Sequence, residues 1–144
     1  MIDDATEHIN YRPLRGHKYQ LTTAAYVAVP WLEGYEFYAA NRLVAVTPSG
    51  TLTIQAGFAW DGSSGPTRDD KTNMRGSLFH DALYQTLRAG LLPQSLRPQI
   101  DDLFLAMLKE DGMGRIRLRY YRLIKRFGGL TSKQQDPPEI LTAP

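Results

Sequence analysis

The 144-residue sequence contains no cysteine, which excludes disulfide bonds, thiolate nucleophiles, cysteine zinc sites and iron–sulfur clusters. Long hydrophobic runs are also missing: the longest, Ala24 to Leu32, has nine residues with Pro30 inside it, far short of a bilayer span. The first ten residues are polar and acidic, so we expect no secretory signal. The charge is nearly balanced at +2, so a nucleic-acid partner is not expected.

The composition is that of an ordinary globular protein, with 42% apolar and 22% charged residues. A chain of this length buries roughly 70% of its unfolded surface, which is enough for one core. We therefore expect a single domain over residues 1–129. Residues 130–144 carry Pro137-Pro138 and Pro144 with few apolar groups, so we expect a C-terminal tail there.

Alternation of apolar residues marks the first half of the chain. Between Thr51 and Trp60 every second residue is apolar, namely Leu52, Ile54, Ala56, Phe58 and Trp60. A period of two predicts a half-buried strand. Turn residues Pro48-Ser49-Gly50 precede this run, so we predict a β-hairpin over residues 41–60. The Tyr-, Thr- and Val-rich residues 18–29 predict one or two further strands, punctuated by Pro13 and Pro30.

The spacing becomes helical after Met74, where Phe79, Leu83 and Leu87 recur every four residues. We expect three helices: from about residue 74 to a cap at Gly90, from Gln94 or Ser95 to Asp111-Gly112, and from Arg115 to Phe127 before Gly128-Gly129. Strands followed by helices indicate an α+β fold, with an N-terminal antiparallel sheet or hairpin and then three α-helices.

A histidine–aspartate pair is the strongest candidate for chemistry. His80 and Tyr84 lie four residues apart and so share one helix face. On the next helix, Asp101 falls at the edge of the apolar stripe and Asp102 on the opposite side. A carboxylate at that edge needs a partner. We therefore predict that Asp101 hydrogen-bonds His80 and fixes its tautomer, as a buried aspartate does in nucleophilic triads.

A second candidate is an oxygen-rich metal site. Asp61 ends the alternating run and begins a loop with two glycines and two serines. Such loops place carboxylate and carbonyl oxygens around a hard cation, and Asp81 could add a second carboxylate. The alternative is a simple tight turn. For His80 and Asp101, likewise, the alternative is a structural tie between two helices.

The third predicted helix is strongly basic. It carries Arg115, Arg117, Arg119, Arg122, Lys125 and Arg126. Its predicted apolar stripe consists of Ile116, Tyr120, Leu123, Ile124 and Phe127. We expect this stripe to dock on the domain and leave a solvated basic face. Contact with phosphate, a membrane surface or an acidic partner is the alternative.

Four motifs occur in an order that resembles a family of uncharacterised domains carried by tailed bacteriophages and prophages. They are Gly57-Phe58-Ala59-Trp60-Asp61-Gly62-Ser63-Ser64-Gly65-Pro66, His80-Asp81-Ala82-Leu83-Tyr84, Asp101 with Phe104, and Tyr120-Tyr121 through Phe127-Gly128. The resemblance spans about residues 40 to 129. It implies a virion or the bacterial host cytoplasm as the location and other phage chains as partners. Separately, we expect the polar, proline-rich C-terminal tail to be held by such a neighbouring chain.

The two central helices also resemble the helix pair of calcium-dependent phospholipases A-two, notably the lipase domain of parvovirus minor capsid proteins. The stretch concerned is HDALYQTLRAG with the following IDDLFLAMLKED. The resemblance implies that His80 activates water, Asp81 binds calcium, Asp101 orients His80 and Tyr84 supports the network. The family's glycine-rich calcium loop is not clearly reproduced by Gly65-Pro66-Thr67-Arg68-Asp69.

Three functions remain open on the sequence. The first is a phage-encoded, metal-dependent hydrolase of a cell-envelope lipid or ester, with His80, Asp101 and Tyr84 as the catalytic set and Asp61 and Asp81 as ligands of a calcium-like ion. The second is a structural or tail-assembly protein in which His80 and Asp101 only tie two helices together. The third is a small regulatory or anti-defence protein that binds through the basic helix.

Overall fold

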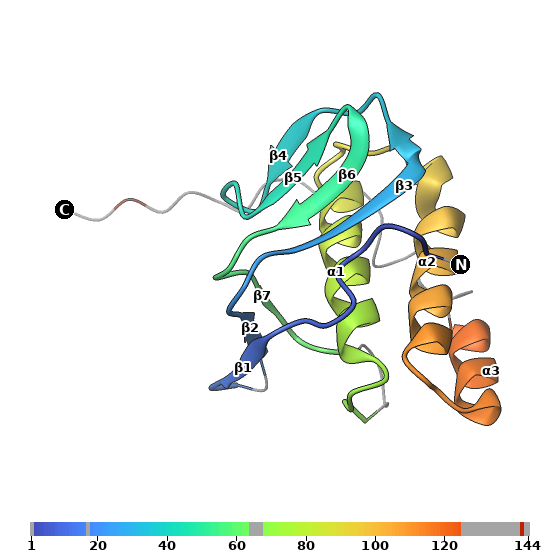
Figure 1. Cartoon of the computed structure of the whole chain (residues 1–144). Coiled ribbons are helices and arrows are strands. Elements are labelled where there is room, and N and C mark those ends of the chain that lie inside the picture. The colour runs from blue at the N-terminus through green and yellow to red at the C-terminus, as the bar shows by residue number, and fades with distance from the viewer. Residues whose placement is uncertain (1, 17, 64–67, 125–141, 143–144) are drawn as a thin grey trace.

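The strands precede the helices in the structure, which confirms the α+β class (Figure 1). This computed structural model describes residues 2–16, 18–63, 68–124 and 142. Predictions that fall on residues 64–67 and 125–141, including the end of the third helix and most of the tail, lie outside the described residues.

Two antiparallel sheets form the β half. The smaller sheet has the order β1-β2-β7, with β1 at Tyr11–Leu14, β2 at Lys18–Leu21 and β7 at Ala59–Trp60. The larger sheet has the order β3-β6-β5-β4, with β3 at Ala25–Glu33, β4 at Phe37–Ala39, β5 at Val44–Thr47 and β6 at Ser49–Ile54. The strands predicted within residues 18–29 are β2 and β3. β3 extends past Pro30, which is exposed where the pairing register shifts between Ala28 and Glu33.

The predicted hairpin over residues 41–60 is wrong in its second half. The β5–β6 hairpin is present, but β6 ends at Ile54. The chain then turns through Gly57, whose φ of +102° suits glycine far better than any other residue. Phe58 and Trp60 keep the alternation because they are buried too, yet β7 pairs with β2 in the other sheet. The alternation of apolar residues therefore indicates which side chains are buried, but it does not indicate which strand pairs with which.

The N-terminal segment, residues 2–6, covers the outer edge of β3. The amide of Thr6 donates to the carbonyl of Tyr26, and the amide of Ala28 donates to the carbonyl of Asp4, at 2.9 and 2.8 Å. The amide of Ile2 continues to Glu110 Oε1 at 3.0 Å. An exposed strand edge is an aggregation hazard, so this segment protects the larger sheet while joining it to the helices.

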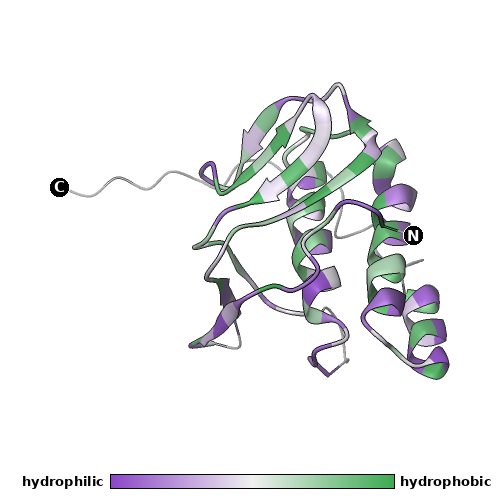
Figure 2. Ribbon diagram, viewed as in Figure 1, coloured by the Kyte–Doolittle hydropathy of each residue, from purple (hydrophilic) through white to green (hydrophobic). Residues whose placement is uncertain are grey.

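The helices are α1 at Met74–Arg88, a short 3₁₀ helix η1 at Gln94–Leu96, α2 at Arg97–Glu110 and α3 at Arg115–Ile124. Helix α1 lies between the sheets and α2, and apolar residues line the inner faces (Figures 1 and 2). The indole of Trp60 donates to Ser77 Oγ at 3.0 Å and ties β7 to α1. Gly90 and Gly112 follow α1 and α2 with positive φ, as predicted for C-terminal caps. No helix in the described part of the chain is both long and apolar enough to cross a membrane.

The predicted docking face of α3 is wrong for most of its stripe: Ile124 does pack against the buried cluster, and Phe127 lies outside the described residues. Leu118 and Tyr121 pack inward, at 7% and 2% exposure, whereas Ile116, Tyr120 and Leu123 of the predicted stripe lie at the surface. The inward face is defined by partners that periodicity cannot show. Tyr121 contacts the ring of Phe104 edge-on, with centroids 5.6 Å apart, and its hydroxyl is 2.6 Å from Ser63 Oγ.

Gly76 permits the close approach of α1 and α2. A Cβ atom at this position would lie 2.9 Å from Cδ1 and 3.2 Å from Cε1 of Phe104. Gly76→Ala is therefore expected to destabilise the protein by about 1–3 kcal/mol, although alanine is the better helix former. Gly114→Ala, where nothing lies within 4 Å, is the control for steric crowding; because Gly114 caps the start of α3, it should cost no more than about 1 kcal/mol. Urea unfolding measures both, and equal effects would contradict the steric argument.

Candidate active site

The predicted contact between α1 and α2 is present. His80 Nε2 lies 2.8 Å from Asp101 Oδ1. Asp101 is 2% exposed, while the neighbouring Asp102 faces the solvent, as the helical spacing predicted. The two helices are antiparallel neighbours joined by a short connection, which brings the residues together across 21 positions of sequence.

Asp101 is the centre of a buried network rather than half of a pair. The Tyr84 hydroxyl donates to the same Oδ1 at 2.6 Å, and Arg97 Nη1 donates to Oδ2 at 3.3 Å. Burial, and then the bond to Asp101, raise the pKa of Tyr84 above its ordinary value, so the phenol stays a donor. Three donors therefore satisfy one carboxylate, which offsets the cost of removing it from water.

The His80 ring is held in one orientation. It stacks obliquely on Tyr84 and on Phe104, with centroid separations of 4.0 and 4.7 Å. Because the carboxylate accepts from Nε2–H, the lone pair of the neutral ring is on Nδ1. Nδ1 has no hydrogen-bond partner in the described part of the chain, where every buried polar side-chain atom has one, so solvent reaches it. The site thus presents an oriented proton acceptor at the surface.

Asp81 and Asp61, the two predicted metal ligands, lie near one another. Burial raises the pKa of Asp81, and the negative charge of Asp61 raises it further, while Gln85, Arg88 and His80 oppose the shift. Gln85 Nε2 donates to Asp81 Oδ2 at 3.1 Å. Among the described residues, no group of three or more histidine, aspartate or glutamate side chains is placed to hold a metal. These two carboxylates would need backbone or water oxygens to complete a cation site.

Asp81→Asn is expected to stabilise the protein by about 0.5–2 kcal/mol at pH 7. A carboxyl group whose pKa is raised by folding binds more protons when folded, so wild-type stability falls as the pH rises through that raised pKa. Asparagine does not ionise, so the variant does not lose stability as the pH rises, and its carbonyl can still accept from Gln85. The gain should vanish below the pKa of an unfolded aspartate, about 3.9. Thermal unfolding between pH 3 and 8 checks this, and a gain independent of pH would contradict it.

The loop after Asp61 is tied to β2 through Asp69 and to α3 through the contact of Ser63 Oγ with the Tyr121 hydroxyl, which the sequence did not predict. Asp69 Oδ1 accepts from the amide of Ser63 at 2.8 Å, and Asp69 Oδ2 accepts from the hydroxyl of Tyr19 on β2 at 2.9 Å. A Cβ atom on Gly62, whose φ is +80°, would fall 2.6 Å from this carboxylate. Glycine is therefore required here for the loop to close over Asp69, and that closure fixes the chain next to Asp61.

The structure brings His80, Tyr84 and Asp101 together where α1 meets α2, with Asp81 on α1 and Asp61 near Asp81, and it adds two residues that were not predicted. Arg97 precedes Asp101 by one helical turn, a spacing typical of ion pairs, so it could have been found. Phe104 was quoted only as part of a motif, and its contact with His80 depends on Gly76. Comparisons of the chain with protein family models, curated proteins and solved structures return no match.

Proposed function

We propose that the protein is a hydrolase in which His80 acts as general base on water, with an ester of a cell-envelope lipid as the substrate class. The observation that carries the proposal is the orientation of one imidazole. Its Nε2 is 2.8 Å from the buried Asp101, while its Nδ1 is open to solvent. A positioned base of this kind contributes about 10²–10⁴-fold to a rate.

The reaction is a general-base hydrolysis. Nδ1 of His80 takes a proton from water as the water oxygen bonds to the ester carbonyl carbon. The resulting imidazolium is stabilised by the Asp101 carboxylate, which keeps its bonds to Tyr84 and Arg97. When the tetrahedral adduct collapses, the carbon–oxygen bond to the alcohol breaks and the alcohol oxygen receives the proton from Nδ1. The products are an acid and an alcohol, and His80 is regenerated.

Asp61 and Asp81 would hold a calcium-like ion that polarises the carbonyl oxygen. Burial and the nearby charge of Asp61 both raise the pKa of Asp81. A divalent cation between the two carboxylates would relieve their mutual repulsion. Calcium titration should therefore raise the melting temperature of the wild type and leave that of Asp81→Asn unchanged. An equal response of both proteins would remove the ion from the proposal but leave His80 in it.

The association with phage particles is proposed on the sequence motifs alone. It makes other phage chains the partners, with the C-terminal residues 130–144 as one means of attachment. A structural role in assembly is the second candidate function. The saturation of Asp101 by three donors favours it, because a network of this kind also serves to lock two helices together.

The deciding experiment is hydrolysis of a short-chain phospholipid and of p-nitrophenyl butyrate, with and without calcium. His80→Ala should lower the rate at least 100-fold while the circular dichroism spectrum is kept. His8→Ala, which changes an exposed histidine outside the site, is the matched control and should retain the full rate. No hydrolysis by the wild type, or equal rates for wild type and His80→Ala, would overturn the hydrolase proposal in favour of the structural one.

A further inference from the structure

Helix α3 carries an apolar ridge on its outer side. Ile116, Tyr120 and Leu123 are 88%, 39% and 51% exposed, and at 100° per residue they fall within about 60° of each other. Three exposed arginines follow one flank of this line, namely Arg115, Arg119 and Arg122. We call these six residues the α3 ridge. No acidic residue occurs in the helix, so the ridge is both apolar and positive.

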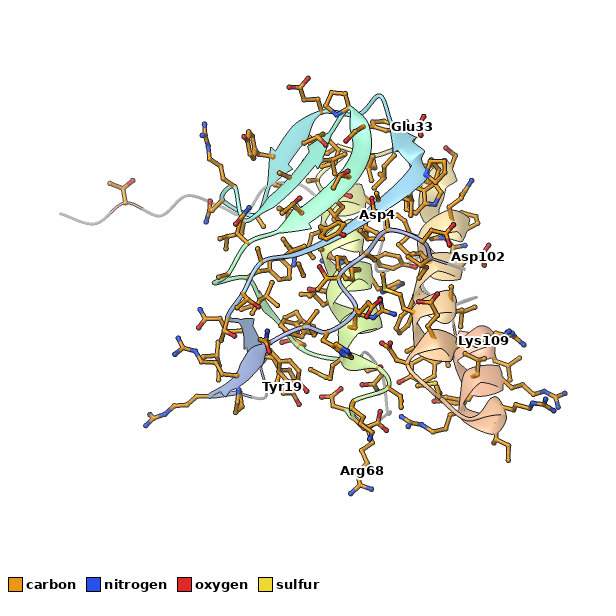
Figure 3. The ribbon with its side chains drawn as sticks, in the orientation of Figure 1. Asp4, Tyr19, Glu33, Arg68, Asp102 and Lys109 are labelled. Atoms are coloured by element: carbon orange, nitrogen blue, oxygen red, sulfur yellow. The ribbon has the colours of Figure 1, made fainter. Side chains whose placement is uncertain are left out.

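A groove of opposite charge lies between the N-terminal segment, β3 and α2. Its volume is about 610 Å³. Apolar side chains form much of the lining, among them Val29, Trp31 and Leu103. Its carboxylates are Asp3, Asp4 and Asp102, and none of its lining residues is basic. Figure 3 shows Asp4 on the N-terminal segment and Asp102 on α2. We call this hollow the acidic groove.

We infer that the α3 ridge of one molecule docks in the acidic groove of a second copy of this chain. The two surfaces match in both respects that matter for association. Apolar side chains would leave water on each side, and the positive charge of the ridge would meet the negative charge of the groove. A lipid surface would account for the ridge, but it would leave the groove unexplained. The inference does not depend on the hydrolase proposal, because none of its residues touches His80.

Both surfaces stand on rigid parts of the fold. The ridge is held from behind by the buried Leu118 and Tyr121. One wall of the groove is fixed by the main-chain bonds of the N-terminal segment to β3 and the other by helix α2. Little backbone conformational entropy is therefore lost when the surfaces meet, which favours association.

Two variants on opposite surfaces test the inference. The ridge variant combines Ile116→Gln, Arg119→Glu and Leu123→Gln, and the groove variant combines Asp3→Lys with Asp102→Lys. All five positions are exposed, so folding should survive, as thermal unfolding verifies. In sedimentation velocity the wild type should associate with rising concentration, and each variant alone should associate at least tenfold more weakly. Tyr38→Gln, at an exposed apolar residue outside both surfaces, should behave as the wild type.

The mixture of the two variants is the decisive sample. The ridge variant keeps an intact groove, and the groove variant keeps an intact ridge, so an equimolar mixture should associate at least tenfold more strongly than either component alone. Failure of the mixture to associate, or a monomeric wild type, overturns the inference. A monomeric wild type that binds phosphatidylglycerol vesicles through the ridge would identify a membrane as the occupant instead.

Discussion

Asp101→Asn is expected to lower the rate of ester hydrolysis at least 100-fold and to cost about 1.5–3 kcal/mol of stability. The rate falls because the amide no longer stabilises an imidazolium at His80. The stability falls because an NH₂ group replaces the oxygen that accepts from Arg97, and two donors then face each other. Tyr84 and His80 must also share one neutral carbonyl in place of a carboxylate.

Asp102→Asn provides a control that the chain itself supplies. It makes the same chemical change at the adjacent residue of the same helix, but on its exposed side. We expect a full rate and a stability change within about 0.5 kcal/mol. Urea unfolding and the pH–rate profile should be measured on both proteins. A wild-type rate in Asp101→Asn with a large loss of stability would assign the network to structure and not to catalysis.

Arg75→Ala should be the most destabilising single change outside the site, at about 3–5 kcal/mol. The Arg75 side chain is 7% exposed, and its guanidinium donates to both carboxylate oxygens of Asp111, each at 3.0 Å. It also donates to Glu110 Oε2 at 3.1 Å and to the carbonyl of Thr6 at 3.2 Å. Alanine would leave two carboxylates and a carbonyl without their cation. A fall in melting temperature of about 10 °C is expected for a chain of this size.

Arg117→Ala is the comparison for Arg75→Ala. Arg117 pairs with Asp70, but the two side chains are 40% and 35% exposed, so the pair is screened by water. Its removal should cost no more than about 1 kcal/mol.

Acid should reduce the difference in free energy of unfolding between Arg75→Ala and the wild type. The pKa of Glu110 is lowered in the fold by Ile2 and Arg75 against the effect of burial, so that contribution is lost as the pH falls through the lowered pKa.

The helical half of the fold could be predicted because one face of α1 and α2 is apolar and local signals end each helix. The same periodicity also predicted a side-chain contact: the angular position of Asp101 on α2 was enough to predict its hydrogen bond with His80 on α1. The β half could be predicted only locally. Phe58 and Trp60 continue the alternation of buried residues seen in β6. Trp60 nevertheless belongs to β7, which pairs with β2 some 40 residues away, and no local pattern encodes such a pairing.

The orientation of α3 could not be predicted because the helix has apolar residues on two sides. Ile116 and Leu123 form the more hydrophobic line, yet Leu118 and Tyr121 are the residues that pack inward. The choice depends on polar partners, since in the interior the Tyr121 hydroxyl lies 2.6 Å from Ser63 Oγ and accepts from Asn73 Nδ2 at 3.3 Å. The loop after Asp61 escaped prediction for the same reason, as its anchors are single side chains from distant parts of the sequence.

The N-terminal segment has a consequence for how the chain is made. The amide of Ile2 donates to Glu110, which is 108 residues away, and the carbonyl of Thr6 accepts from Arg75, which is 69 residues away. During synthesis this segment and β3 emerge close together, so its bonds to β3 can form early, whereas its contacts with Arg75 and Glu110 form only once α1 and α2 have been synthesised. Slow translation before residue 110 would therefore prolong the interval in which this segment is held on the edge of β3 by its strand bonds alone.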